Sequence, residues 1–121
     1  KLLILLFSIL ISFNSYGDSS DGTICVETDG KWRDGIIYYE TKPFTGKDVC
    51  KYENGQKKFE ISFKDGKLDG KMTMWYENGQ KEREYYLKDL KIDGKFTIWH
   101  ENGQIWAEKN YKDGVCISGD C

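Results

Sequence analysis

The sequence predicts an all-β fold, an elongated antiparallel meander of repeated β-hairpins preceded by an N-terminal signal helix. The main observation is a period of 24 residues, because the tetrapeptide Glu-Asn-Gly-Gln occurs at 53–56, 77–80 and 101–104. Asn-Gly between strand-like residues is a strong hairpin signal. Beyond the signal segment, glycine interrupts the chain every few residues and β-branched and aromatic residues fill the intervals, which disfavours helix.

The first residues have the features of a secretory signal peptide. Lys1 is followed by an apolar run over 2–13, and small residues occupy positions 15 and 17. The run is shorter than the roughly 20 apolar residues that cross a bilayer, which predicts cleavage after Gly17 and a secreted or periplasmic protein. The alternative is an uncleaved anchor, the one case in which a membrane would be a partner.

The chain divides into a signal peptide (1–17), an N-terminal β segment (18–43) and the hairpin repeats with a C-terminal Cys tail (44–121). The length after the signal suits one domain with a modest core. Loss of Lys1 takes the formal net charge from −2 to −3, with the two signs interleaved along the chain. This pattern argues against nucleic acid as a partner and against a general attraction to anionic lipid.

All four cysteines follow the predicted signal peptide, and an even count in an exported chain indicates disulfides. Three pairings exist. We favour Cys25 with Cys50, since one precedes the repeats and the other opens them, and Cys116 with Cys121, since they lie close in sequence. A metal site would need a CxxC-like spacing and further ligands, and the sequence has one histidine, so we expect no metal and no cofactor.

Each repeat is predicted to be one hairpin with a type I′ turn at Asn-Gly. The first strands are expected at 47–52, 71–76 and 95–100, and the returning strands at 56–63, 80–87 and 104–111. The Lys-Asp-Gly segments are expected to form wider turns to the next hairpin.

Alternation of side chains assigns the two faces of the sheet. The face expected to form the core carries Cys50, Tyr52, Phe59, Ile61, Phe63, Met72, Met74, Tyr76, Tyr85, Leu87, Phe96, Ile98, Ile105, Ala107 and Tyr111. The opposite face combines aromatic and acidic residues, namely Thr73, Trp75, Glu82, Glu84, Tyr86, Thr97, Trp99, Trp106, Glu108 and Asn110. Aromatic side chains supply much of the energy at recognition surfaces. The candidate binding surface is therefore Trp75, Trp99, Trp106, Glu84, Glu108 and Tyr86. The alternative is that the tryptophans only cover the second face of a curled sheet.

The repeated aromatic pair, Glu-Asn-Gly-Gln, charged strand and Lys-Asp-Gly turn resemble the bacterial variant of the MORN repeat. The segments 33–39 and 42–46 resemble the leader that commonly precedes such repeats, so the resemblance covers roughly residues 33–115. It implies an elongated array of β-hairpins, and a likeness to YwqK-type antitoxin components of toxin–antitoxin systems. The signal peptide and the four cysteines depart from that family pattern, so an antitoxin-like role here implies an exported partner, as for an immunity protein.

No motif predicts catalysis. Glu60, Glu84 and Glu108 occupy equivalent positions, but two carboxylates become a general acid and a base only in a cleft that separates their pKa values. His100 replaces Tyr52 and Tyr76 of the earlier units and has no activated Ser or Cys nearby. The acidic segment 65–70 lacks two ligands of a calcium-binding loop and is expected to be a turn.

The sequence thus predicts an exported repeat protein that is not an enzyme and that serves as a protein–protein interaction scaffold, immunity- or antitoxin-like by resemblance. The alternative is a carbohydrate or cell-wall binding module, because regularly spaced tryptophan and tyrosine residues on hairpin repeats are typical of such modules.

Overall fold

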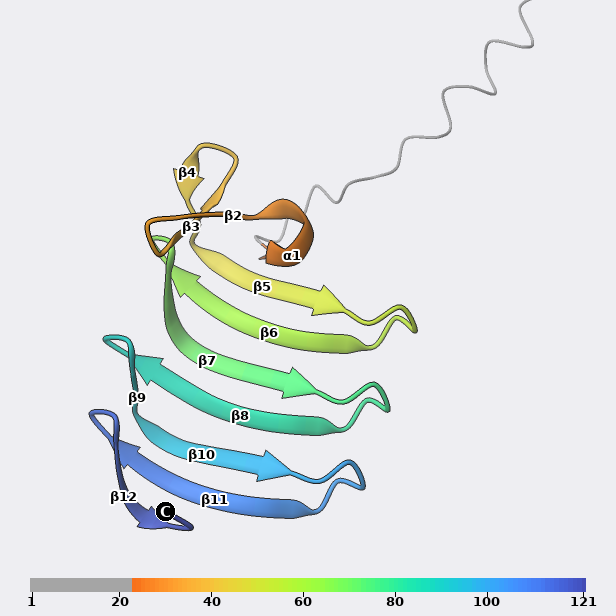
Figure 1. Cartoon of the computed structure of the whole chain (residues 1–121), viewed down its shortest axis with the longest axis vertical. Helices are drawn as coiled ribbons and strands as arrows, with labels where there is room; N and C mark the ends of the chain where they lie inside the picture. Colours follow the sequence, from red (N-terminus) through yellow and green to blue (C-terminus); the bar gives the residue numbers. More distant parts are fainter. Residues whose placement is uncertain (1–22) are drawn as a thin grey trace, which may run out of the picture.

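The computed structural model describes residues 23–121, and the predicted signal peptide lies outside this range (Figure 1). Between residues 23 and 121, no helix has the length and apolar character needed to span a membrane. The described chain is a row of β-hairpins that runs from a small N-terminal cap to the C-terminus.

The N-terminal cap, residues 23–43, is more varied than the expected β segment. Its elements are β1 (Thr23–Ile24), the single-turn helix α1 (Val26–Asp29), β2 (Lys31–Arg33), β3 (Ile36–Tyr39) and β4 (Lys42–Pro43). The short helix was not predicted from the sequence. β1 pairs in parallel with the first repeat strand, whereas β2, β3 and β4 form a separate three-stranded sheet.

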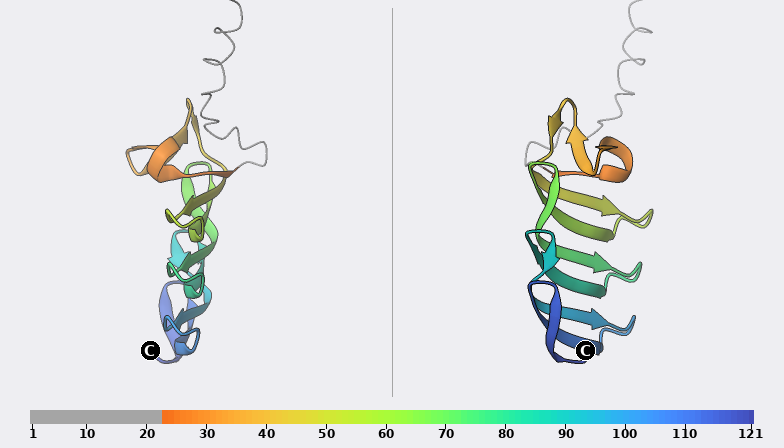
Figure 2. Two further views of the ribbon diagram at one scale, coloured as in Figure 1. Left: turned by 90° about the vertical axis from the view of Figure 1, so that its right-hand side faces the viewer. Right: turned by 60° about the vertical axis from the view of Figure 1, so that its left-hand side comes forward.

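The repeats form one antiparallel sheet, as predicted. Its strands are β5 (Gly46–Lys51), β6 (Lys57–Lys64), β7 (Lys67–Trp75), β8 (Lys81–Lys88), β9 (Lys91–Ile92), β10 (Gly94–Trp99), β11 (Ile105–Lys112) and β12 (Val115–Gly119). The spatial order is β1-β5-β6-β7-β8-β10-β11-β12, with β9 beside β8. Seen from its edge, the array is a single curled layer (Figure 2).

The prediction of a type I′ turn at each Asn-Gly is wrong. The Tyr76 N–H donates to the Gln80 carbonyl and the Gly79 N–H donates to the Tyr76 carbonyl, so the loop contains three residues. Gly79 has a φ of 87°, whereas none of the asparagines in these loops has a positive φ within residues 23–121. Asn78 instead accepts a hydrogen bond from the Gln80 N–H at 2.9 Å, an Asx turn that keeps the asparagine out of the left-handed region. A bulge follows in each hairpin.

The type I′ turns lie at the Lys-Asp-Gly segments, which had been predicted to form wider turns. Asp65 has a φ of 50° and Gly66 a φ of 79°, and the flanking residues Lys64 and Lys67 pair directly. The Gly66 N–H donates to the carbonyl of Phe44. A β-carbon on this glycine would collide with Ile36, so the close approach of the turn to the cap requires glycine.

The buried core lies at the cap end of the array. Ile24, Ile37, Phe44 and Phe63 form one cluster where the cap covers the first hairpin. Leu87 and Tyr111, which occupy the position of Phe63 in the second and third hairpins, are only partly buried. Of the later hairpins, only Met72 is buried on the face that was expected to be a core throughout, within the described residues. The rest of that face is partly exposed, because nothing in residues 23–121 forms a second layer over the later hairpins (Figure 2).

Both favoured disulfides are present in the structure. Cys25–Cys50 joins the cap to β5, and Cys116–Cys121 closes the segment that contains β12.

Candidate functional site

One face of the sheet, here called the Glu/Thr face, carries a ladder of directly paired residues along its centre. Glu60 lies opposite Thr73, Thr73 opposite Glu84, and the same alternation continues through Thr97 to Glu108. The 24-residue repeat produces this ladder, since equivalent residues of successive hairpins fall at the same height of the sheet.

Lysines flank the ladder and pair with each glutamate. Glu60 lies 2.9 Å from Lys47 and 3.0 Å from Lys57, and these hydrogen bonds lower the pKa of the Glu60 carboxyl. Burial by itself would raise the pKa of Glu84, but Lys81 and Lys71 together outweigh it and lower that pKa. Glu108 has one such partner, Lys95, at 2.7 Å. The first two carboxylates are both stabilised as anions, which is unlike a general acid paired with a base.

The tryptophans of this face are covered by lysines of the preceding hairpin. Lys57 Nζ lies 5.5 Å from the ring centre of Trp75, and Lys81 Nζ lies 5.7 Å from that of Trp99, distances typical of cation–π contacts. Tyr86 lies on the same face, opposite Lys71, and is 44% exposed. The structure thus brings together Trp75, Trp99, Glu84, Glu108 and Tyr86 of the predicted surface.

Trp106, the sixth predicted surface residue, lies on the other face. The bulge in β11 pairs Trp99 with Ile105 instead of Trp106, so Ile105 joins the Glu/Thr face. The Trp106 ring centre is 6.1 Å from that of His100, a residue that alternation places with Ile98 on the apolar side. The bulge adds one residue to the returning strand. Ile105 and Trp106 therefore each lie on the face that had been predicted for the other. Glu82 holds the position equivalent to Trp106 and is exchanged in the same way.

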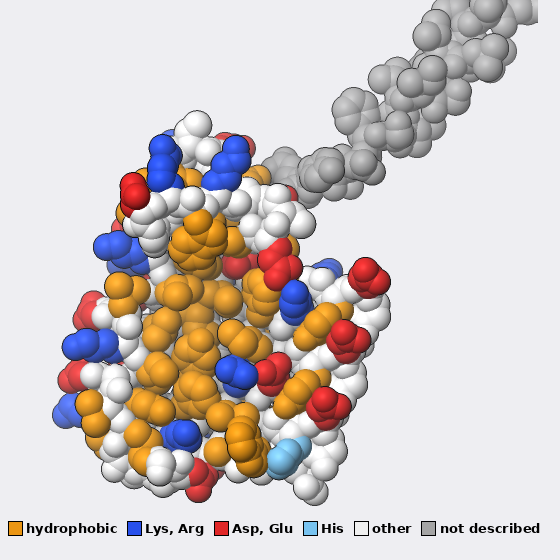
Figure 3. All heavy atoms as spheres, in the orientation of Figure 1, with side chains coloured by type: hydrophobic (Ala, Val, Ile, Leu, Met, Phe, Trp, Pro, Cys, Tyr) orange, Lys and Arg blue, Asp and Glu red, His pale blue; other side chains and the backbone are white. Residues whose placement is uncertain are grey.

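The opposite face, here called the apolar face, has few charges and a broad band of hydrophobic side chains (Figure 3). Its paired residues include Phe59, Ile61, Met72, Met74, Arg83, Tyr85, Phe96, Ile98, Ala107 and Lys109. Tyr85 stacks on Phe96 of the next hairpin with ring centres 4.9 Å apart. The Nε of Arg83 is buried without a hydrogen-bond partner within the described chain, while its Nη2 lies 2.8 Å from Glu82. Beyond the cap this face is half-buried apart from Met72, which is 1% exposed, and no described residue forms a layer above it.

The loop tips of successive hairpins are joined by two further ladders, which sequence reasoning missed. The Tyr52 hydroxyl donates to the Trp75 carbonyl at 2.7 Å, and Tyr76 repeats the contact with Trp99 at 2.8 Å. Asn54 and Asn78 donate from Nδ2 to the carbonyls of Glu77 and Glu101. The strict repetition of tyrosine and asparagine could have indicated these contacts. At the last tip, a shallow groove is lined by Tyr76, His100, Glu101, Asn102 and Gln104.

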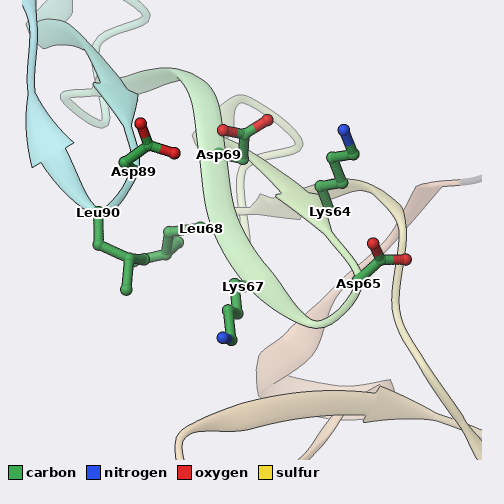
Figure 4. A pocket seen from close by; sticks show the side chains of 7 residues that line it. All are labelled: Lys64, Asp65, Lys67, Leu68, Asp69, Asp89 and Leu90. Atoms are coloured by element: carbon green, nitrogen blue, oxygen red, sulfur yellow. The ribbon is translucent and has the colours of Figure 1, made fainter.

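A second unpredicted feature is a cleft beside the turn at Asp89 and Leu90 (Figure 4). Leu90 occupies the position of Gly66 and Gly114 and has a φ of 61°. Gly66 and Gly114 each donate to the preceding unit, to Phe44 and Ile92 respectively. Within residues 23–121 Leu90 has no equivalent bond to Leu68, and the space between the two leucines opens into the cleft.

Asp48 is a buried carboxyl beside the Cys25–Cys50 disulfide. It accepts a hydrogen bond from the Val26 N–H at 2.8 Å, which links β5 to the cap. Burial raises the pKa of Asp48 from 3.8 to about 6, against the lowering effect of that bond. Its oxygen and the two sulfurs lie within 4.8 Å of one another, but each sulfur is already bonded to the other and the trio is not a thiolate metal site in this state.

Together, these features define a single-layer repeat protein with two chemically distinct faces. The family profile described as MORN repeat variant matches residues 49–65, 68–89 and 92–113, and the chain belongs to that family. Comparison with curated proteins finds no match, and comparison with solved structures also finds none.

Proposed function

We propose that this chain is an exported, non-catalytic scaffold that binds a protein partner through the apolar face of its second and third hairpins. The observation that carries the proposal is the half-exposed aromatic and aliphatic surface on a single-layer sheet (Figure 3). Uncovered apolar surface on a soluble protein is typical of an interaction site. The MORN repeat variant family supports the general assignment, because such repeats commonly bind proteins or other ligands.

The Glu/Thr face is the weaker of the two candidate surfaces. Its glutamates already have lysine partners, and its two tryptophans lie under lysine side chains. A partner that uses this face must break those contacts before it gains its own. The surface predicted from the sequence, Trp75, Trp99, Glu84, Glu108 and Tyr86, therefore remains a hypothesis. The experiment compares it directly with the apolar face.

The test is affinity capture with the exported protein, followed by measurement of affinity for the purified partner. Tyr85→Ala with Ile98→Ala should weaken binding at least about tenfold, as loss of central contacts in an interface does. Trp75→Ala with Trp99→Ala, on the other face, is the matched control and should leave the affinity within about twofold. Loss of binding in the tryptophan variant alone would move the site to the Glu/Thr face.

Export is part of the proposal. Two disulfides fit an oxidising compartment, and the predicted signal peptide agrees with them. An immunity- or antitoxin-like role is the specific form that the resemblance implies, and its partner would then be an exported toxin. Secretion of the full chain with a fused reporter, and sequencing of the mature N-terminus, test the compartment; retention of residues 1–17 in the cell envelope would contradict cleavage.

A carbohydrate or cell-wall ligand is the second candidate, favoured by the groove at the last loop tip. Its lining combines aromatic, amide and carboxylate groups, and Trp106 beside it is 64% exposed. Sugar-binding sites commonly use such flat aromatic surfaces with polar neighbours. Retention on peptidoglycan or glucan, quenching of tryptophan fluorescence by soluble sugar, and loss of both in Trp106→Ala would support it. Absence of retention and of quenching eliminates it.

A further inference from the structure

In the last hairpin, part of the outer strand edge has no following strand beside it, whereas β7 follows β6 and β10 follows β8. β12 pairs only with the C-terminal half of β11, from Lys109 onward, and Asp120 bonds the backbone of Glu108. On this outer side, no described residue pairs with the segment 104–107, which is called the open edge (Figure 1). In the second hairpin β10 lies on this side and its Ile98 pairs with Arg83, the equivalent of Ala107, while residues 80–82 have no strand partner there within the described chain.

The open edge lacks the charged residues that usually protect an exposed strand edge. Natural sheets place charged residues on exposed edges to prevent unwanted pairing. The two hairpins that have another hairpin beside them carry charges at the equivalent positions, Lys57-Lys58 in the first and Lys81-Glu82 in the second. Ile105 and Trp106 occupy these positions in the third hairpin and are 54% and 64% exposed. Among the described hairpins, apolar residues thus replace charged ones in the repeat that has no following hairpin beside it.

The tip beside this edge also carries an unused donor. Asn54 and Asn78 each donate to a carbonyl of the following hairpin, at 2.8 and 2.7 Å. Asn102, their equivalent, has no such acceptor within residues 23–121. Asn102 is exposed, so its Nδ2 is free to donate to a backbone carbonyl of a strand placed on the outer side of β11.

From these observations we infer that a second copy of this chain occupies the open edge, with 104–107 of the two copies paired antiparallel about a two-fold axis. The segment Gln-Ile-Trp-Ala is uncharged and therefore complementary to itself, and antiparallel pairing is the geometry of every neighbour in the repeat array. At the other end of the array, β1 pairs with Lys47 and Asp48, and a disulfide joins Cys25 to Cys50. An isologous contact uses the same edge of both copies, so association through the open edge stops at a dimer.

The experiment is sedimentation velocity of the exported protein over a range of concentrations. Ile105→Lys with Trp106→Glu restores the residues that the second hairpin tolerates at these positions, so the variant keeps the fold, as circular dichroism will verify. It should weaken dimerisation at least about tenfold. Val115→Lys is the matched control: it also changes an exposed apolar residue, 64% exposed, to the lysine found at Lys67 and Lys91, but it lies outside the open edge and should leave the dimer unchanged.

Hydrogen exchange provides a second readout. The amides of 105–107 should exchange more slowly as the concentration of the wild-type protein rises, and this dependence should vanish in the double variant. A wild-type protein that stays monomeric at about 100 μM, a concentration well above a typical specific dissociation constant, overturns the inference. A dimer that the double variant leaves intact also overturns it. Neither result bears on partner binding through the apolar face, which the Tyr85 and Ile98 substitutions test separately.

Discussion

The first and third hairpins share one sequence pattern but differ in what covers their apolar face. In the first, Phe63 is 5% exposed beneath the cap, in contact with Phe44 and Trp32. In the third, the equivalent Tyr111 is half-buried, and Trp106 on the same face is 64% exposed. The same repeat is thus a core at one end and a surface at the other. In a repeat array each unit contacts only its neighbours, so its stability depends on its position as much as on its sequence.

The largest expected effect is at Phe63. Phe63→Ala should lower the free energy of unfolding by roughly 3–5 kcal/mol, because it empties a buried aromatic site at the junction of cap and repeats. Leu87→Ala is the matched change one repeat later, where the side chain is half-buried, and should cost about 2 kcal/mol. Guanidinium unfolding followed by circular dichroism measures both. Equal losses would contradict the difference between the two ends.

The two disulfides extend the comparison to covalent links. Cys25–Cys50 closes a span of 25 residues and Cys116–Cys121 a span of 5. Loop-closure entropy then predicts a loss of about 3.5 kcal/mol for Cys25→Ala with Cys50→Ala and about 2 kcal/mol for the C-terminal pair. The first variant should also release the cap, seen as faster hydrogen exchange at Ile37. A larger loss of stability on removing the C-terminal disulfide would contradict the view that attachment of the cap stabilises the array most.

A pH dependence should arise at the cap end. Because the pKa of Asp48 is raised to about 6 in the folded protein, protonated Asp48 favours folding. Its contribution is complete below the unfolded value of 3.8 and is lost as the pH rises through 6, a change of about 2–3 kcal/mol. Asp48→Asn keeps an acceptor for the Val26 N–H and does not titrate. The free energy of unfolding, measured by thermal or chemical unfolding, should therefore fall between pH 4 and 7 for the wild type and change less for the variant. An equal pH dependence in both proteins would exclude Asp48 as the cause.

The smallest expected effect is at the turn between the two ends. Leu90→Gly should raise the free energy of unfolding by about 1 kcal/mol, since a leucine with positive φ is strained and glycine is not. It also removes the side chain that keeps this turn from docking as Gly66 and Gly114 do. Gly114→Leu is the reciprocal change and should destabilise by a similar amount. A Leu90→Gly variant that is less stable than the wild type would show that packing of the Leu90 side chain beside the cleft stabilises the fold by more than the backbone strain costs.

The sequence predicted the strands well and the turns poorly. The 24-residue period located all three hairpins to within a few residues. It could not decide between a two-residue and a three-residue loop at Asn-Gly, because the choice depends on the Asx bond at Gln80 and on the contact of Asn78 with the next hairpin. The bulge that results moved Trp106 away from the other predicted surface residues.

By itself the sequence determined the repeat, the antiparallel sheet and the separation of an apolar from a polar face, because periodicity is a property of the chain; it favoured one of three cysteine pairings, and the structure contains that pairing. Tertiary structure decided which part of the apolar face is a core, which tryptophans share a surface and which strand edge is open. These depend on contacts between residues distant in sequence: the cap over Phe63, the lysines over Trp75 and Trp99, and β12 beside only half of β11. A local pattern recurs with few changes in every repeat and cannot specify what lies next to each copy.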